Sequence, residues 1–296
     1  TYAVRILKAF GSGIGSFREQ MMAGQLFATP AVLAFVLSLS GNAQTSQPDQ
    51  LPSTSPPAAQ SPLFSQPSRD NYDRPISWKL FAPNLLSDQK AIWLFPAKIA
   101  KDHNWIPALS IGAATASLFM LDPYEGRYFH TTSTFHGFNG VFTGNATGIG
   151  AALAPVSLYA VGLARRDTKM QHTALLAGEA IIDAEIVGTV LKDIDKRVRP
   201  VAFKTHGNYW DSWFEGKGSV IAGTGSFPSG HAIAAFSTAT VIAHRYRTHR
   251  WVPYAAYGIA GAVSFSRLSV SAHFTSDVFM GAALGYCISR FAVLRY

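Results

Sequence analysis

Six apolar stretches of helical length follow one another along this chain, and hardly any of them shows the two-residue alternation of a β-strand. A shorter segment, at residues 88–101, carries Ile92, Phe95 and Ile99 at helical spacing, and Pro96 is expected to kink it. Gly, Pro and Asn are concentrated between the stretches, where helices end. The pattern predicts an all-α helical bundle of about six core helices, at about 105–121, 148–164, 172–192, 230–245, 252–266 and 276–294.

Composition and charge narrow the classes of partner. The 296 residues are 48% hydrophobic, which excludes a chain that is disordered throughout. Lys and Arg number 25 against 17 Asp and Glu, so the net charge of +8 favours anionic partners such as phosphates or acidic lipid surfaces. No helix-turn-helix, zinc-finger or RNA-binding signature accompanies this charge, so no nucleic-acid partner is expected. The single cysteine, Cys287, allows neither an internal disulfide nor a cysteine metal cluster.

The first 70 residues resemble a delivery segment rather than a domain. Three basic residues precede an apolar run at 26–39, and the small residues of 41–43 follow it, as in a secretory signal peptide. Residues 1–43 are therefore interpreted as a signal peptide, with an N-terminal anchor as the alternative. Residues 44–70 are rich in Pro, Ser and Gln and predict a disordered linker. The folded domain is expected at 71–296, exported to a bacterial periplasm or anchored in the cell membrane.

Charges inside the apolar stretches bear on whether the bundle spans a membrane. The 172–192 stretch contains Glu179, Asp183 and Glu185, which are costly in lipid unless they face the protein interior. In a soluble bundle the same residues can mark the solvated face. Several stretches are also shorter than the ~20 residues that a span needs. These features favour a soluble or membrane-associated bundle over six spans, and the integral alternative stays open.

Three motifs carry residues suited to a tetrahedral oxyanion. They read K-x6-R-P, P-S-G-H and S-R-x5-H-x3-D, and they occur in this order along the chain. Together they supply three cations, two imidazoles, a carboxylate and a glycine-containing turn. The residues are Lys192, Arg199 and Pro200; Pro228, Ser229, Gly230 and His231; and Ser266, Arg267, His273 and Asp277.

Each motif also has a purely structural interpretation. Lys192 suits the negative end of a helix dipole, and Pro200 is expected to stop that helix and hold Arg199 extended. Ser229 can be an ordinary N-cap, although a helix N-terminus with Gly230 also binds phosphate readily. The neighbours of the first motif, Lys196 and Arg197, are interpreted as solvated surface.

The third motif predicts a histidine with an orienting carboxylate. Residues four apart share a helix face, so Asp277 is expected to hydrogen-bond His273 across one turn. Two further segments, 122–147 and 201–226, carry His, Asp, Glu and Trp that can line a pocket or simply pack as structure; the structural interpretation is favoured.

In their order and intervals, the three motifs resemble the type 2 phosphatidic acid phosphatase superfamily, which includes bacterial class A acid phosphatases and vanadium-dependent haloperoxidases. The resemblance covers about residues 100–296 and is closest in style to exported bacterial acid phosphatases. It implies a helical bundle with its site at helix ends and a phosphohistidine intermediate. His273 would be the nucleophile, Asp277 its orienting partner and His231 the acid. The phosphoryl oxygens would be held by Lys192, Arg199, Ser229, Gly230 and Arg267.

The expected activity is hydrolysis of phosphomonoesters, including those of lipids or isoprenoids, without a metal or other cofactor. Phosphoryl transfer depends mainly on positioning and charge neutralisation, which three cationic side chains can supply. Vanadate is expected as an inhibitor. Two alternatives remain open: an integral membrane lipid phosphatase, and a haloperoxidase in which vanadate is the prosthetic group. Neither the substrate nor the oligomeric state follows from the sequence.

Overall fold

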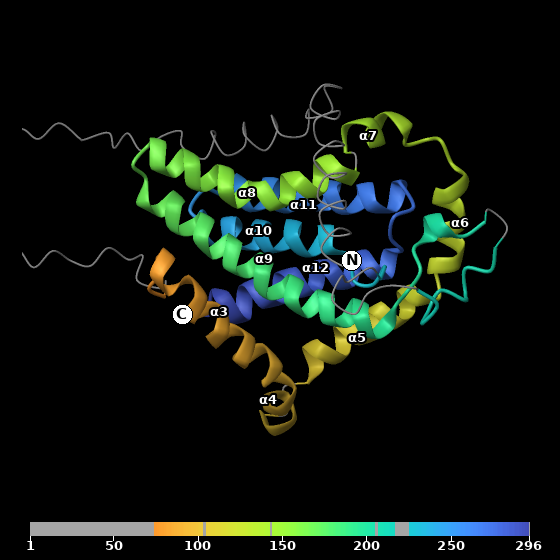
Figure 1. Ribbon diagram of the computed structural model, residues 1–296, viewed down its shortest axis with the longest axis horizontal. Coiled ribbons are helices and arrows are strands. Elements are labelled where there is room, and N and C mark those ends of the chain that lie inside the picture. Colours follow the sequence, from red (N-terminus) through yellow and green to blue (C-terminus); the bar gives the residue numbers. More distant parts are fainter. Residues whose placement is uncertain (1–73, 103–104, 143, 205–206, 217–224, 296) are drawn as a thin grey trace, which may run out of the picture.

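The computed structural model describes residues 74–102, 105–142, 144–204, 207–216 and 225–295. The predicted signal peptide or anchor at 1–43 and the predicted linker at 44–70 lie outside the described residues. Within those ranges the chain forms helices and no strand, which confirms the predicted all-α bundle (Figure 1). The elements, labelled as in Figure 1, are α3 (Trp78–Trp93), α4 (Phe95–Asp102), α5 (Ile106–Phe119), α6 (Asp122–Thr131), α7 (His136–Val141), α8 (Gly144–Ala164), α9 (Thr168–Asp195), the 3-10 turn η1 (Pro200–Ala202), α10 (Gly230–Arg245), α11 (Trp251–Ser269), α12 (Thr275–Ile288) and the π-helical turn η2 (Ser289–Val293).

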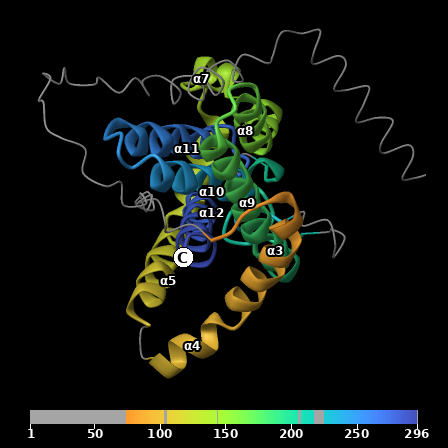
Figure 2. The ribbon, with the colours of Figure 1, turned by 90° about the vertical axis from the view of Figure 1, so that its left-hand side faces the viewer.

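Helix α10 occupies the centre of the bundle, with α8, α9, α11 and α12 around it (Figures 1 and 2). One core cluster joins α8, α9, α10 and α11 through side chains such as Leu158, Met170, Ile242 and Val252, each at most 5% exposed. Small residues dominate the buried surface of α10, so its neighbours can approach closely. The apolar stretch at 230–245 is therefore a core helix, with the bounds that the sequence predicts.

Glycines bring α12 against the beginning of α10. A Cβ on Gly281 would lie 2.5 Å from the carbonyl oxygen of Ser229, closer than side chains tolerate. The Ser229 amide in turn donates to the carbonyl oxygen of Asp277 at 2.9 Å. The second and third motifs are thus joined backbone to backbone.

The acidic residues of α9 do not mark a solvated face, contrary to the interpretation from sequence. Glu179 and Asp183 are fully buried, because the segment before α3 and α3 itself cover them. Arg74 forms ion pairs with Glu179 and with Asp88, the latter at 2.6 Å, and Gln89 donates to Asp183 at 2.8 Å. A charged group cannot be buried cheaply without a partner, so this cluster fixes α3 on α9.

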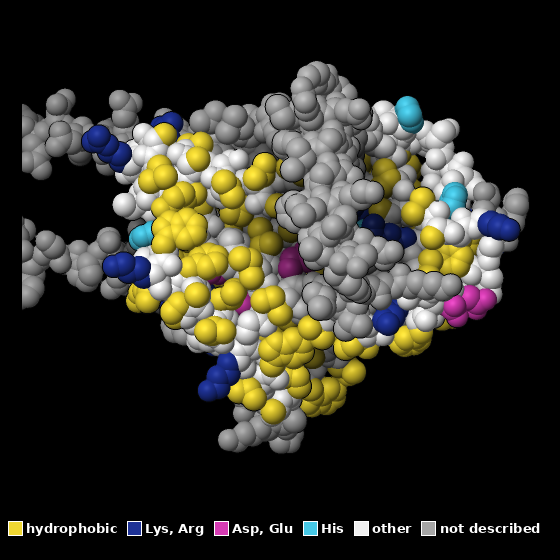
Figure 3. All heavy atoms as spheres, in the orientation of Figure 1, with side chains coloured by type: hydrophobic (Ala, Val, Ile, Leu, Met, Phe, Trp, Pro, Cys, Tyr) yellow, Lys and Arg dark blue, Asp and Glu magenta, His cyan; other side chains and the backbone are white. Residues whose placement is uncertain are grey.

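Helices α3, α4 and α5 form an arm that projects from the bundle, with α4 at its tip (Figure 2). The chain bends at Leu94, and Pro96 follows at the second position of α4, where its missing N–H costs nothing. Large apolar side chains near the tip are half or more exposed: Trp93 51%, Phe95 53%, Trp105 50% and Ile106 66%. Figure 3 shows hydrophobic side chains gathered along this part of the surface.

Among the described residues, one helix is long and apolar enough to cross a membrane, at Ala146–Ala164. A second passes the same test only if α5 and α6, bent by 54° from one another, are taken as one span.

Candidate active site

The helix ends at one end of the bundle bring the motif residues together (Figure 1). Helix α9 does not run on to Pro200 as expected; it ends at Asp195, and Lys196 adopts a left-handed conformation with φ of 44°. Arg199 is extended, as the following proline predicts. The other residues stand in the last turn of α9 (Lys192), at the start of α10 (Ser229, Gly230, His231), in the last turn of α11 (Arg267), just before α12 (His273) and in its first turn (Asp277).

His273 is held in one tautomer by a backbone carbonyl. Its Nδ1 lies 2.7 Å from the carbonyl oxygen of Ser226, which can only accept, so Nδ1 carries the proton. The other ring nitrogen, Nε2, therefore has its lone pair. Burial lowers the pKa of His273, against the opposing effect of Asp277, and Arg199 and Lys192 lower it further. The lowered pKa favours a neutral imidazole whose Nε2 carries no proton.

The expected hydrogen bond between Asp277 and His273 is not formed. His273 precedes α12 instead of belonging to it, and its Nδ1 lies 3.7 Å from Asp277 Oδ2. That oxygen accepts from Ser226 Oγ at 2.6 Å and from the Phe274 amide at 2.8 Å. Asp277 thus caps α12 and reaches His273 by charge at short range, while Ser226 links the two residues.

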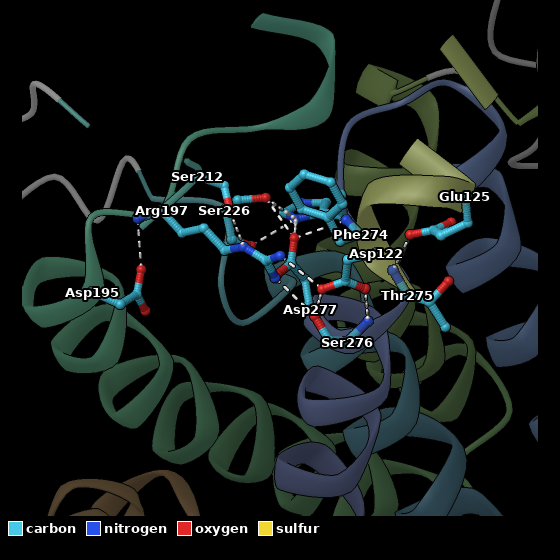
Figure 4. A network of polar contacts seen from close by, with 11 residues as sticks. Asp122, Glu125, Asp195, Arg197, Ser212, Ser226, Phe274, Thr275, Ser276 and Asp277 are labelled. Carbon is cyan, nitrogen blue, oxygen red and sulfur yellow. Dashed lines mark hydrogen bonds and ion pairs between the residues drawn. The ribbon is translucent and has the colours of Figure 1, made fainter. Parts of the chain in front are cut away.

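Arg197 lies at the centre of the network that holds Asp277, so its interpretation as solvated surface is wrong (Figure 4). The guanidinium is 2% exposed and pairs with Asp277 at 2.6 Å and with Asp122 at 2.7 Å. The rings of Phe274 and Trp213 flank it at 4.1 and 4.4 Å. Burial by itself would raise the pKa of Asp277, but Arg197 and the other partners hold it below its usual range.

Helix α6 supplies two further carboxylates to this network, in a segment that the sequence favoured as structural packing. Asp122 accepts from the Ser276 amide at 3.1 Å, and Glu125 accepts from the Thr275 amide at 2.7 Å. The first amides of α12 are therefore occupied by acidic side chains (Figure 4). This helix N-terminus is held by protein groups.

The beginning of α10 is different, because the hydroxyl of its serine has no partner among the described residues. Ser229 is fully buried, makes no side-chain capping bond, and its Oγ has no hydrogen-bond partner among the described residues. The N-cap interpretation is thus not supported. An unpaired buried hydroxyl beside a helix N-terminus fits a phosphoryl oxygen.

The cations near Ser229 are buried, and Arg199 and Arg267 repel each other. Burial and then Arg199 lower the pKa of Arg267 to about 10, so it stays charged at neutral pH. Arg267 is oriented by the carbonyl oxygen of Phe142, to which its Nη2 donates at 2.8 Å. Burial also lowers the pKa of Lys192. An anion bound here would relieve this repulsion.

His231 lies near His273, with their ring centroids 6.5 Å apart. Burial is the main cause that lowers the pKa of His231 to about 4, and the nearby charge of Arg267 is the second. The Nε2 atom of His231 lies 3.1 Å from the carbonyl oxygen of Gly144. The acid role inferred from the resemblance needs a protonated ring. A phosphate dianion among the same cations would raise the pKa of His231 toward that state.

Glu185 was not among the predicted site residues, although it lies near the motifs. The carboxylate of Glu185 in α9 lies against Gly230 beside Lys192.

Within the described ranges, no group of three or more His, Cys, Asp or Glu side chains is arranged to hold a metal.

Part of the chain matches a known protein family. Residues 173–296 match the PAP2 superfamily. This match confirms the resemblance seen in the motifs and covers the second half of the bundle, from α9 onward. The PAP2 region holds all eight predicted site residues, whereas Asp122 and Glu125 lie outside it.

Two known proteins are similar to this chain. A lipid A 1-phosphatase of Porphyromonas gingivalis is 38% identical over 66 residues, which are 22% of this chain and 15% of that protein's length. A crystal structure of a transmembrane PAP2-type phosphatidylglycerolphosphate phosphatase from Bacillus subtilis is 20% identical; the likeness covers 70% of this chain and 94% of that one, with a TM-score of 0.38.

Proposed function

We propose that this chain is a metal-independent phosphatase that hydrolyses phosphomonoesters through a phosphohistidine intermediate. The observation that carries the proposal is the fixed tautomer of His273, whose Nδ1 donates to Ser226 and whose Nε2 is left as a nucleophile in a cluster of cations. The family match and the relative named as a lipid A 1-phosphatase support the same reaction class.

In this mechanism the Nε2 lone pair attacks phosphorus and the bond from phosphorus to the leaving oxygen breaks. The leaving oxygen takes a proton from His231, and Asp277 stabilises the charge that develops on the His273 ring. Lys192, Arg199 and Arg267 neutralise the phosphoryl oxygens, with the Ser229 hydroxyl and the Gly230 amide as further donors. Water then attacks the phosphohistidine while His231 takes back a proton, releasing orthophosphate.

The intermediate can be trapped. Mixing the full chain with 32P-labelled nitrophenyl phosphate, quenching without acid and mapping the peptides should place the label on His273. His273→Ala should be inactive with every ester and carry no label. Label on another residue, or none during a burst of product release, would exclude the covalent route.

The cation cluster is proposed to do the work that a metal ion does in other phosphatases. Activity should therefore survive exhaustive treatment with EDTA, and vanadate should inhibit by occupying the phosphoryl site. Loss of activity in EDTA with recovery in Mg²⁺ would contradict this proposal. Bromide oxidation in vanadate and peroxide would instead support the haloperoxidase alternative.

We further propose that the exported domain works at a membrane surface, on phosphate esters of lipids or isoprenoids. The support is the arm α3–α5, whose tip exposes Phe95, Trp105 and Ile106 and carries the exposed cations Lys90 and Lys98. Apolar and aromatic side chains with nearby lysines are typical of segments that enter the headgroup region of anionic bilayers.

A further inference from the structure

Glu185 projects from α9 to the point where α10 begins. A Cβ built on Gly230 would lie 3.1 Å from Glu185 Oε1 and 3.2 Å from Lys192 Nζ. The carboxylate and the ammonium therefore both pack against the backbone of the residue whose amide is proposed to bind phosphate. Any side chain at position 230 would displace one of them.

Lys192 is the charged group that acts most directly on Glu185. Burial raises the pKa of Glu185, and the charge of Lys192 opposes the rise. An apolar cluster of Val187, Ile233 and Ile288, with Ile92 from α3 packed against it, joins α9 to α10 and α12 nearby. The other charged or titratable groups at this corner are Asp195 on α9, Arg199 beyond it, His231 on α10, Arg267 on α11, and His273 and Asp277 at the start of α12.

A carboxylate in this position conflicts with phosphate binding. Ionised, it attracts Lys192 and repels the dianion that Lys192 and the Gly230 amide are placed to bind. When Glu185 is protonated, it no longer neutralises Lys192, and its O–H can donate a hydrogen bond to a phosphoryl oxygen. The same side chain thus opposes the ligand in one state and supports it in the other.

We propose that Glu185 is a positioning residue that makes anion binding depend on its own protonation, holding Lys192 back when ionised and releasing it to the phosphoryl group when protonated. The inference rests on the proposed function, since it assigns regulation to the same site. It gives the enzyme an acidic pH preference that is independent of the two histidines.

Direct binding of sulfate tests this without turnover. Sulfate is a dianion throughout the range from pH 5 to 8. A change in its affinity with pH, measured by calorimetric titration of the full chain, therefore reports protonation of the protein alone. Glu185→Gln mimics the protonated acid at every pH. It should bind sulfate about tenfold more tightly than wild type at pH 8, as expected for removal of one nearby like charge, and the difference should shrink toward pH 5.

Two variants complete the design. Glu215→Gln removes an exposed carboxylate and should follow wild type at every pH. Glu185→Asp withdraws the charge from Gly230 by one methylene, so it should also bind sulfate more tightly than wild type at pH 8; it carries the test if the Gln variant fails to fold.

The outcomes separate the two proposals. If the wild type hydrolyses esters but the Glu185→Gln variant binds sulfate as the wild type does from pH 5 to 8, the role of Glu185 is overturned and the proposed function stands. A chain that shows the expected affinity difference but hydrolyses no ester overturns the proposed function and leaves Glu185 as the control of an anion site.

Discussion

Ser226 serves the site with two different groups. Its carbonyl oxygen accepts from His273 Nδ1, and its hydroxyl donates to Asp277 at 2.6 Å. The residue's amide also donates to the carbonyl oxygen of Arg197 at 2.7 Å. This one loop residue therefore sets the tautomer of His273, the proposed nucleophile, and joins it to the network around Arg197. Support of this kind keeps a reactive side chain in place.

His231 can be tested through the leaving group. If it donates the proton, its loss should matter little for nitrophenol and much for an alcohol, whose oxyanion is a poor leaving group. His231→Ala is expected to lose about 10²–10⁴-fold in kcat for alkyl phosphates and distinctly less for nitrophenyl phosphate. The measurement is kcat for both esters in both proteins. Equal losses would mean that His231 binds phosphate rather than donating a proton.

The motif residues could be predicted because cations and imidazoles suited to one anion show in the sequence by residue type, and helix ends bring them together. Arg197 could not, because its partners Asp122 and Asp277 lie 75 and 80 positions away and no local pattern marks the pairing. Glu185 likewise fits the spacing of an ordinary helix. Only the packing of α9 on α10 shows what it faces.

At the scale of elements, the core helices follow from apolar periodicity, and the bounds of α10 match it. The ends of the helices were less predictable where local capping contacts, rather than the apolar periodicity, decide where a helix ends. Helix α9 ends at Asp195 rather than running on to Pro200. The segment 122–147, which lies between two predicted core helices, contains α6 and α7, and α6 is directed at the N-terminus of α12. The sequence of α6 is polar and short, so its helicity depends on those contacts.

The crossing of α10 and α12 should be sensitive to one methyl group. Gly281→Ala would place a Cβ 2.5 Å from the Ser229 carbonyl oxygen, so the start of α10 must move. We expect a loss of about 1–3 kcal/mol in the free energy of unfolding and at least a tenfold fall in kcat/KM. Chemical denaturation and steady-state kinetics would measure both.

Gly258→Ala is the matched control. A Cβ there meets nothing within 4 Å, and the position lies in the middle of α11, so alanine should stabilise by up to about 1 kcal/mol with activity unchanged. If both alanine variants behaved alike, close approach at Gly281 would not be what positions Ser229.

At the scale of the whole molecule, buried carboxylates make stability depend on pH. Burial raises the pKa of Asp183 to about 7, and its Oδ2 has no hydrogen-bond partner among the described residues. The folded state therefore keeps this proton up to about pH 7, while the unfolded chain loses it near its ordinary value of 3.8. Because the folded state binds more protons in that window, this group makes stability fall as pH rises through it.

Asp183→Asn should remove that part of the pH dependence. Between pH 6 and 8 the wild type is expected to lose about 1 kcal/mol more of its free energy of unfolding than the variant does. Urea titrations at both pH values give the difference directly. Parallel curves for the two proteins would mean that Asp183 is ionised throughout.

The proposal that the protein works at a membrane surface can be tested on the projecting arm. Replacing Leu94, Phe95 and Trp105 by serine should weaken cosedimentation with anionic phospholipid vesicles about tenfold or more, because the apolar contact is lost. Tyr254→Ser, which changes an 82% exposed aromatic residue on α11, should leave binding unchanged. Equal binding of all three proteins would remove the arm from the interaction.

The network of contacts around Arg197 also bears on where this chain can be truncated. Residues 173–296 contain every motif, yet a fragment with those bounds would lose Asp122 and Glu125, which bind Arg197 and the first amides of α12. It would also lose Arg74, the partner of Glu179. The stretch that carries the motifs is thus smaller than the unit that these contacts hold together, and a fragment that keeps them has to include Arg74.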